Sequence, residues 1–307
     1  MFNKLTLSLS IILLISLVVN VLSVREIIKY EPAKYKFRIY NNFKQKGWFD
    51  KSFGVEKLSA DSTAYIMTLG QSNSANSSNA LDTASTNAYS YYNGQLYRAQ
   101  DPMVGCSGDG GSVWPILADK IILAKKYKRV VIIPIAVGST KVECWATGKC
   151  AVILKETLAD LNAHHIRLTQ ILWQQGESDN GSSKVIYRQN LEKVLKNIRA
   201  GGQKAPFFCA ITSYTNEAES KPEGIDSEIE DAQIEFIKAH KDVLAGPNTD
   251  SIIGAIDRHD SLHFSKVGKH KYAELWYKAL FVNDTDERVI YRAKISASSP
   301  AINLVKK

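Results

Sequence analysis

Short apolar runs alternate with longer amphipathic stretches along most of this 307-residue chain. Five runs are short and apolar, as strands buried on both faces of a sheet should be, and they are residues 64–69, 130–137, 170–173, 207–212 and 252–256. The stretches that follow them have helical patterns, at residues 113–126, 151–164, 184–199, 228–240 and 266–280. This alternation predicts an α/β domain with a doubly wound, mostly parallel sheet between two layers of helices.

An uncharged apolar run of 20 residues, 5–24, precedes this pattern. Its length suffices for a helix that spans a bilayer and exceeds the apolar part of a usual signal peptide. We therefore expect residues 1–24 to form an uncleaved membrane anchor, with a cleaved signal segment as the alternative. Basic residues after the run favour a cytoplasmic domain, but large domains translocate largely regardless of charge. We expect export, so that the domain faces the periplasmic or extracellular side.

The rest of the chain divides into three parts. Residues 25–62 are basic and aromatic without an apolar face at helical spacing, which favours a stalk that packs on the domain over a segment that lies on lipid. Residues 63–282 form the α/β domain. Residues 283–307 form a C-terminal extension, in which residues 288–294 are predicted as a peripheral strand and the last residues are expected to be loose.

Composition narrows the class of protein. A chain that is 45% hydrophobic and 23% charged fits a globular domain with a substantial core. The net charge of +8 is spread along the chain, which indicates an anionic environment such as a membrane surface or an acidic glycan rather than nucleic acid. The four cysteines permit disulfides in an oxidising compartment and match no zinc pattern. Cys209 lies inside an apolar run and is predicted to be a buried thiol.

Candidate chemistry begins where the first predicted strand ends, in Gly-Gln-Ser-Asn at residues 70–73. A tight turn there can lift Ser72 clear of the backbone at the edge of the sheet where ligands bind, and a nearby base can make it a nucleophile. Far downstream, Asp260 precedes His263 by three residues, so the carboxylate can orient one imidazole nitrogen while the other faces a serine. Asp257 and His259 are an alternative acid and base in the same segment.

A third motif, Gln-Gly-Glu-Ser-Asp at residues 175–179, completes a combination that resembles the SGNH (GDSL-like) hydrolases. Within that family it is similar to the sialate O-acetylesterase branch of carbohydrate acetylesterases. The α/β-hydrolases share the order Ser, Asp, His but carry Gly-x-Ser-x-Gly, which is absent here. The resemblance implies the SGNH three-layer, flavodoxin-like sandwich, with Ser72 as nucleophile, His263 as base and Asp260 as the acid that orients it. It implies neither a metal nor an organic cofactor.

Ester cleavage also needs donors that point at the developing oxyanion. Besides the N–H of the nucleophile, Gly111 lies in a glycine-rich turn at the place where the family carries its oxyanion glycine. Gln175 matches the glutamine of the family motif Trp-x-Gln-Gly-Glu-x-Asp. Gln71, beside the nucleophile, is a further candidate contact. These three residues are the predicted oxyanion and substrate contacts.

Three more residues complete the predicted site. Glu177 and Asp179 are expected to fix the turn after the third strand rather than to act as a glycosidase pair, which would leave the serine and histidine unexplained. Trp145 follows a segment that resembles the family's Gly-Gly-Thr, in which Ser139 replaces a glycine. This tryptophan either stacks on a sugar ring or lies in the core.

The predicted function is a serine esterase that removes acetyl groups from a carbohydrate. The expected partners are an acetylated glycan and, through residues 1–24, a membrane, but not nucleic acid. Two alternatives remain: an O-acetyltransferase that uses the same residues on envelope polysaccharide, and a glycan-binding protein without catalysis. The simultaneous presence of Ser72, Asp260 and His263 counts against the second alternative. The sequence indicates neither the sugar nor the oligomeric state.

Overall fold

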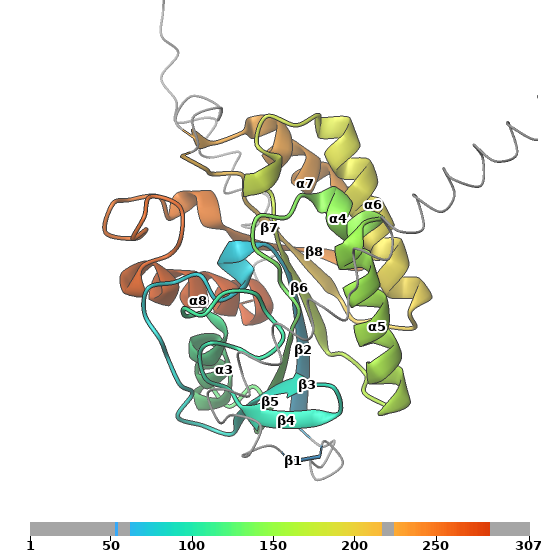
Figure 1. Ribbon diagram of the computed structural model, residues 1–307, viewed down its shortest axis with the longest axis vertical. Coiled ribbons are helices and arrows are strands. Elements are labelled where there is room, and N and C mark those ends of the chain that lie inside the picture. The colour runs from blue at the N-terminus through green and yellow to red at the C-terminus, as the bar shows by residue number, and fades with distance from the viewer. Residues whose placement is uncertain (1–52, 55–61, 217–223, 283–307) are drawn as a thin grey trace, which may run out of the picture.

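The computed structural model describes residues 53–54, 62–216 and 224–282, in which a single sheet runs between two layers of helices (Figure 1). The strand order is β1-β4-β3-β5-β2-β6-β7-β8. The strands are β1 Phe53–Gly54, β2 Thr63–Gly70, β3 Ala88–Tyr92, β4 Gln95–Arg98, β5 Arg129–Pro134, β6 Gln170–Gln174, β7 Phe207–Ile211 and β8 Val243–Asn248. Pairs from β3 to β8 are parallel, whereas β4 and β1 extend one edge antiparallel.

Helices cover both faces of the sheet (Figure 1). One face packs on α3 and α8, which span Trp114–Leu123 and Lys266–Phe281, and together they bury one apolar core. The other face packs on α4 to α7 over the larger core. These helices are α4 Val142–Ala146, α5 Lys149–Ala163, α6 Lys184–Ala200 and α7 Ser227–Ala239. The predicted α/β class with a mostly parallel sheet flanked by helices is confirmed.

Most predicted elements are confirmed within a few residues, but the last predicted strand is wrong. The strand at that edge is β8, and residues 252–256 form a loop in which Ile252 is buried and Ile256 is 69% exposed. β8 contains Gly246 and Pro247, which interrupt an apolar pattern. An edge strand tolerates proline because one row of its backbone groups needs no partner. The short elements β1, β3, β4 and α4 were not predicted.

The segments at both ends of the chain fall outside the described residues. These are the predicted membrane segment 1–24, most of the predicted stalk 25–62, and the extension 283–307 with its predicted strand. From the stalk, Phe53–Gly54 pair with β4 at the sheet edge. Within the ranges that the structure describes, no helix has both the length and the apolar character needed to cross a bilayer.

The four cysteines form one disulfide and two buried free thiols. Cys209 is fully buried as a free thiol, as predicted, and Cys106 is a second buried free thiol. Cys144 and Cys150 form a disulfide between α4 and α5.

The sheet topology brings several turns together at the carboxyl ends of the parallel strands. β2 lies between β5 and β6, and the register of β2 and β6 places Gly70 beside Gln174. Because parallel strands end at the same edge, the turns after β2, β5, β6 and β7 meet there. The residues singled out in the sequence follow three of these strands.

Candidate active site

Ser72 lies in the turn that follows β2, at the centre of the sheet. Gly70 has a φ of +138°, and a Cβ at this position would lie 1.8 Å from the carbonyl oxygen of Gln174, so only glycine fits. The Gln71 N–H then donates to that carbonyl at 3.1 Å, and the short helix η3, Ser72–Ser74, begins. The close approach of β6 therefore fixes where the chain turns and where Ser72 is presented.

Asp260 and His263 pair directly in the loop before α8. Asp260 Oδ2 lies 2.6 Å from His263 Nδ1, and Asp260 Oδ1 accepts from the backbone N–H groups of Leu262 and His263 at 3.0 and 2.6 Å. Partial burial alone would raise the pKa of Asp260, but these hydrogen bonds outweigh it and lower the pKa to about 2. The carboxylate is thus held ionised beside the imidazole, as the predicted pairing requires.

The alternative pair does not form. The Asp257 carboxylate accepts from Lys271 Nζ at 2.9 Å. His259 Nε2 faces the carbonyl oxygen of Ser77 at 3.1 Å. The sequence left Asp257 with His259 open as a rival, and the structure favours Asp260 with His263.

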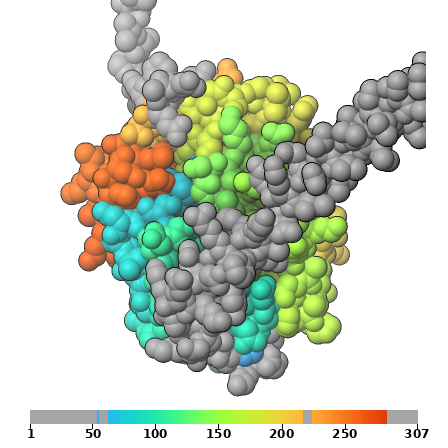
Figure 2. All heavy atoms as spheres, in the orientation of Figure 1, coloured from blue at the N-terminus to red at the C-terminus, as the bar shows by residue number. Residues whose placement is uncertain are grey.

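The serine turn and the histidine loop lie side by side. Asn73 Nδ2 lies 3.4 Å from the carbonyl oxygen of Leu262, and the contact between His259 and Ser77 makes a second link. Figure 2 shows the cyan segment after β2 adjoining the orange segment before α8. Ser72 and Phe264 also line one small cavity of about 10 Å³. No hydrogen bond joins Ser72 Oγ to His263 in the described residues.

Glu177 and Asp179 support the turn after β6, as the sequence predicts. Glu177 is 3% exposed, and its Oε1 accepts from Asn73 Nδ2 at 2.9 Å and from Gln174 Nε2 at 2.7 Å. Asp179 Oδ2 accepts from the Val142 N–H at 2.8 Å, although burial raises the pKa of this carboxyl. Both carboxylates therefore hold loops together, and neither is directed at solvent.

Gln71 ties the serine turn to the same region. Its Oε1 accepts from the Ser178 N–H at 3.0 Å, and its side chain is almost fully buried. Its Nε2 donates to no acceptor among the described residues. Gln71 is thus anchored through its oxygen and keeps an amide N–H pair available beside Ser72.

The predicted oxyanion role of Gln175 is corrected by its contacts. Gln175 is fully buried, and its Nε2 donates to Asp179 Oδ2 at 2.6 Å and to the Thr140 carbonyl at 3.1 Å. Both amide hydrogens are therefore used. Turning the amide over would place its oxygen against a carboxylate and a carbonyl, so the hydrogen-bond network itself assigns this orientation.

Gly111 is likewise not an oxyanion donor. Its N–H donates to the Ser78 carbonyl at 2.8 Å, and the Gly110 N–H donates to Asn76. A Cβ at position 111 would lie 1.7 Å from the Ala80 carbonyl oxygen, which explains the glycine by close packing of two loops. The sequence analysis singled out Gly111 as an oxyanion donor, but the structure requires a glycine there because two loops pack closely.

The turn after β5 approaches Ser72 instead. A Cβ at Gly138 would lie 3.7 Å from the Cβ of Ser72. The Gly138 N–H donates to Ser107 Oγ at 2.7 Å, whereas the N–H groups of Ser72 and Ser139 donate to no acceptor among the described residues. Ser139 has a φ of +55°, the left-handed conformation that a glycine adopts more easily. The signal was present in the sequence as the segment that resembles Gly-Gly-Thr.

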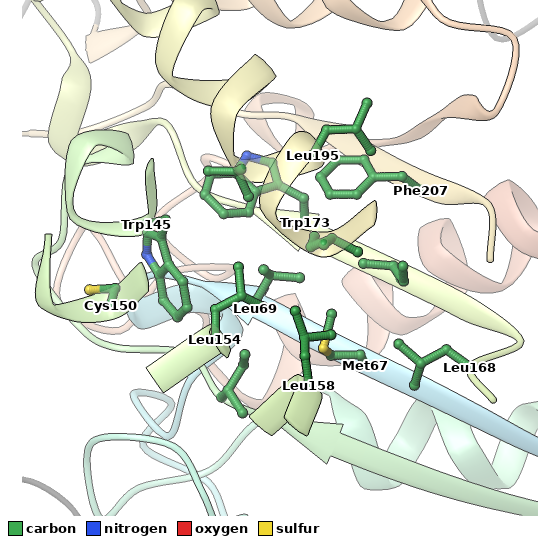
Figure 3. Close-up of a cluster of buried hydrophobic side chains, with 14 of the residues drawn as sticks. Met67, Leu69, Trp145, Cys150, Leu154, Leu158, Leu168, Trp173, Leu195 and Phe207 are labelled. Carbon is green, nitrogen blue, oxygen red and sulfur yellow. The ribbon is translucent and has the colours of Figure 1, made fainter. Parts of the chain in front are cut away.

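Trp145 lies in the core and does not reach the surface (Figure 3). Its ring meets that of Trp173 edge to face at a centroid separation of 6.1 Å, and its Nε1 donates to Thr140 Oγ1 at 3.1 Å. The core interpretation is confirmed and the sugar-stacking one is wrong, because no face of this ring is accessible.

Sequence reasoning missed Arg258, which organises the histidine loop. Its guanidinium is buried and donates to the carbonyl oxygens of Leu262, Thr249 and Ile252. It also lies over the ring of Phe264 at 4.4 Å. Arg258 lies between Asp257 and His259, and nothing in the sequence distinguishes it from a surface arginine.

Comparison with known proteins places this geometry in context. Residues 63–281 match the family described as carbohydrate esterase, sialic acid-specific acetylesterase. No curated protein matches the chain. A solved structure of a protein from Arabidopsis thaliana is similar with a TM-score of 0.57 and 15% identity, over 73% of this chain and 99% of that one. A carbohydrate acetylesterase from Xanthomonas citri has a TM-score of 0.49 and 14% identity, over 70% of this chain and 55% of its own.

Proposed function

Because this chain belongs to the carbohydrate esterase family of sialic acid-specific acetylesterases, we propose that it is a serine esterase that removes acetyl groups from the hydroxyls of a carbohydrate. The observation that carries the proposal is the Asp260–His263 pair, held beside the turn that presents Ser72. Family membership supports ester hydrolysis, and the residues named here supply a route for it.

In the proposed reaction, Ser72 Oγ attacks the acetyl carbonyl while His263 Nε2 takes the hydroxyl proton. Asp260 accepts from Nδ1 and stabilises the imidazolium that forms. His263 then returns the proton to the departing sugar oxygen, which leaves an acetyl ester on Ser72. Water, activated by the same imidazole, releases acetate. The reaction requires His263 Nε2 to come within hydrogen-bond distance of Ser72 Oγ, and catalytic contacts often tighten only in the substrate complex.

The proposed oxyanion donors are N–H groups that have no acceptor within the part of the chain that the structure describes. The backbone N–H of Ser72 is one, and the N–H of Ser139 in the turn beside it is the second. Gln71 Nε2 is a third candidate at the same edge. These groups replace Gly111 and Gln175, whose N–H groups are satisfied within the protein.

A carbohydrate acetylesterase should prefer a short acyl group. The full chain, kept in mild detergent because of its apolar N-terminal run, should be assayed on p-nitrophenyl acetate, butyrate and octanoate. We expect kcat/KM to fall as the acyl chain lengthens. Equal rates for acetate and octanoate would contradict an acetylesterase.

An O-acetyltransferase is the second candidate, favoured by the apolar run at residues 5–24 and the expected envelope location. The Cys144–Cys150 disulfide supports an oxidising compartment, and hence export. With an O-acetylated sugar as donor, hydrolysis should release free acetate at a rate that added unacetylated glycan does not change. Accumulation of acetylated acceptor with little free acetate would establish transfer instead.

A further inference from the structure

Three possible metal ligands meet in the histidine loop. One ligand atom from each of His259, Asp260 and His263 lies within 4.8 Å of the other two. Asp260 Oδ2 is 3.9 Å from His259 Nε2 and 2.6 Å from His263 Nδ1. The two imidazole rings face each other at an interplanar angle of 26°. The proposed esterase reaction gives His259 no role, so it does not explain why these three side chains lie together.

Imidazole nitrogen with carboxylate oxygen is a ligand set that suits zinc. Zinc binds each of these atoms at about 2.1 Å in a tetrahedral arrangement, so two of its ligand atoms lie about 3.4 Å apart. The 3.9 Å separation between His259 and Asp260 therefore has to close slightly, and the 2.6 Å contact between Asp260 and His263 has to open, to admit an ion.

The surroundings also fit a bound cation. The Ser77 carbonyl oxygen lies 3.1 Å from His259 Nε2 and offers an additional oxygen at the same point. The Asp260 side chain is 42% exposed and that of His263 is 22% exposed, so an ion can enter from solvent. The cations around the loop are already engaged, because Lys271 on α8 pairs with Asp257 and Arg258 donates to backbone carbonyl oxygens.

We propose that His259, Asp260 and His263 bind a zinc ion that inhibits the esterase. A metal on Nδ1 of His263 displaces the proton that this nitrogen donates to Asp260. The neutral ring then carries its proton on Nε2, and that nitrogen loses the lone pair needed to accept the Ser72 proton. Inhibition therefore follows from a change of tautomer, without any block of the substrate path. The inhibitory half rests on the proposed function, whereas the binding half does not.

Direct binding is tested first, without reference to activity. Zinc chloride is titrated by calorimetry into full-length Ser72→Ala protein that has been freed of metal with a chelator. We expect one ion per chain. Adding His259→Gln to Ser72→Ala keeps a donor for the Ser77 carbonyl and should weaken zinc binding at least about tenfold, a loss that even residues outside the ligand set can cause. His270→Gln, an exposed histidine on α8, is the matched control and should leave the affinity unchanged.

Inhibition is tested second, on p-nitrophenyl acetate in a buffer that does not bind zinc. The protein with Ser72 intact should lose activity as zinc is added and regain it with chelator, whereas magnesium, which prefers oxygen ligands, should have no effect. His259→Gln should keep the uninhibited rate and require at least about tenfold more zinc for half inhibition.

Equal zinc affinity in the His259→Gln and parent proteins would overturn the site, as would equal sensitivity of their rates to zinc. Zinc binding that depends on His259, in a protein that shows no esterase activity before zinc is added, would support the site and overturn the proposed function instead. The two proposals can therefore fail separately.

Discussion

Individual hydrogen bonds decide which of the polar residues near Ser72 can act on a substrate. Gln175 and Gln71 are both buried glutamines at the same sheet edge, yet only Gln71 keeps amide hydrogens without a protein acceptor. A sequence motif records that a glutamine is present, whereas its role depends on which acceptors the fold places beside it.

Gln175→Ala should lower the free energy of unfolding, and not only kcat. Removing the amide leaves the buried Asp179 carboxylate and Thr140 carbonyl short of a donor, which costs about 1–3 kcal/mol in the free energy of unfolding. Urea unfolding followed by circular dichroism measures this loss. The control is Gln95→Ala on the exposed side of β4, which should change stability by less than about 0.5 kcal/mol. A stable Gln175→Ala protein with a large loss of kcat would restore the oxyanion role.

Asp260→Asn should lower kcat by about 10³ to 10⁴, because the amide cannot hold the imidazole in the tautomer that accepts the serine proton. Asp257→Asn, three residues earlier, removes only a pairing with Lys271 and should leave kcat within about twofold. Steady-state kinetics on p-nitrophenyl acetate compares the two. A larger loss for Asp257→Asn would show that the acid has been misassigned.

At the scale of elements, α8 docks on the loops before α3 through a buried ion pair. Lys269 is 1% exposed, and its Nζ lies 2.6 Å from Asp82 and 3.4 Å from Asp101, whose side chain is fully buried. Burial raises the pKa of Asp101, and the charge of Lys269 opposes that rise. The helix thereby fixes the loop that contains Gly111, and it begins at Lys266, three residues after His263.

Lys269→Ala should destabilise the protein by about 3–5 kcal/mol, since it leaves the Asp101 carboxylate buried without a counter-charge. Lys278→Ala on the same helix removes a pair in which both side chains are exposed, 58% for the lysine and 42% for Glu274, and it should cost less than about 1 kcal/mol. Denaturant unfolding of both variants checks the contrast. Similar losses would mean that the helix, and not the buried pair, is what the substitutions disturb.

Sequence patterns located the elements that have strong periodicity. β2, β5, β6 and β7 are buried parallel strands, and such strands are short apolar runs in any sequence. β8 was missed because an edge strand can contain Gly246 and Pro247, and the context that tolerates them has no local signal. β3 and β4 do have a local signal: they form a hairpin around Asn93-Gly94, whose φ values of +47° and +73° are those of the two-residue turn that Asn-Gly favours.

In the candidate site, too, the sequence predicted a local contact but not the contacts that depend on the folded chain. The contact between Asp260 and His263 spans three residues, so spacing alone predicted it. The roles of Gly111 and Trp145 depend on partners far away in sequence, which are Ser78 and Ala80 for the glycine and Trp173 for the tryptophan. Gln175 has one distant acceptor, Thr140, and one local acceptor, Asp179. Arg258 was missed although its acceptors are near in sequence, because an irregular loop has no periodic pattern that shows where a side chain points.

At the scale of the whole molecule, buried carboxyls set how stability varies with pH. Burial raises the pKa of Asp250 to about 7, against hydrogen bonds from Ser213 and Tyr214 that lower it, and nearby Glu230 and Glu177 raise it further. A pKa that is higher in the folded state means that folding is favoured while the group is protonated. This stability is fully present below pH 4 and is lost as the pH rises to about 7.

The free energy of unfolding should therefore be lower at pH 8 than at pH 5 by an amount on the order of 2–3 kcal/mol, taken from about two pKa units at 1.36 kcal/mol each. Asp119, Glu235 and Glu274 have lowered pKa values, so their contributions are already complete by pH 5 and do not reverse the slope. Urea midpoints at both pH values test this. Asp101 and Asp179, whose pKa values burial also raises, add to the same slope. Asp250→Asn should lower stability at both pH values and remove the part of the difference that Asp250 supplies; an unchanged difference would contradict the assignment.

The central claim is that Ser72 is the nucleophile of an esterase whose base is His263. Diethyl p-nitrophenyl phosphate reacts with an activated serine to leave a diethylphosphoryl group on Oγ and release p-nitrophenolate. After brief treatment of the full chain, peptide mass spectrometry should find one adduct, on the peptide that contains Ser72. His263→Ala should react far more slowly, and Ser72→Ala not at all. An adduct on a different serine, or equal labelling in the His263→Ala protein, would contradict the account.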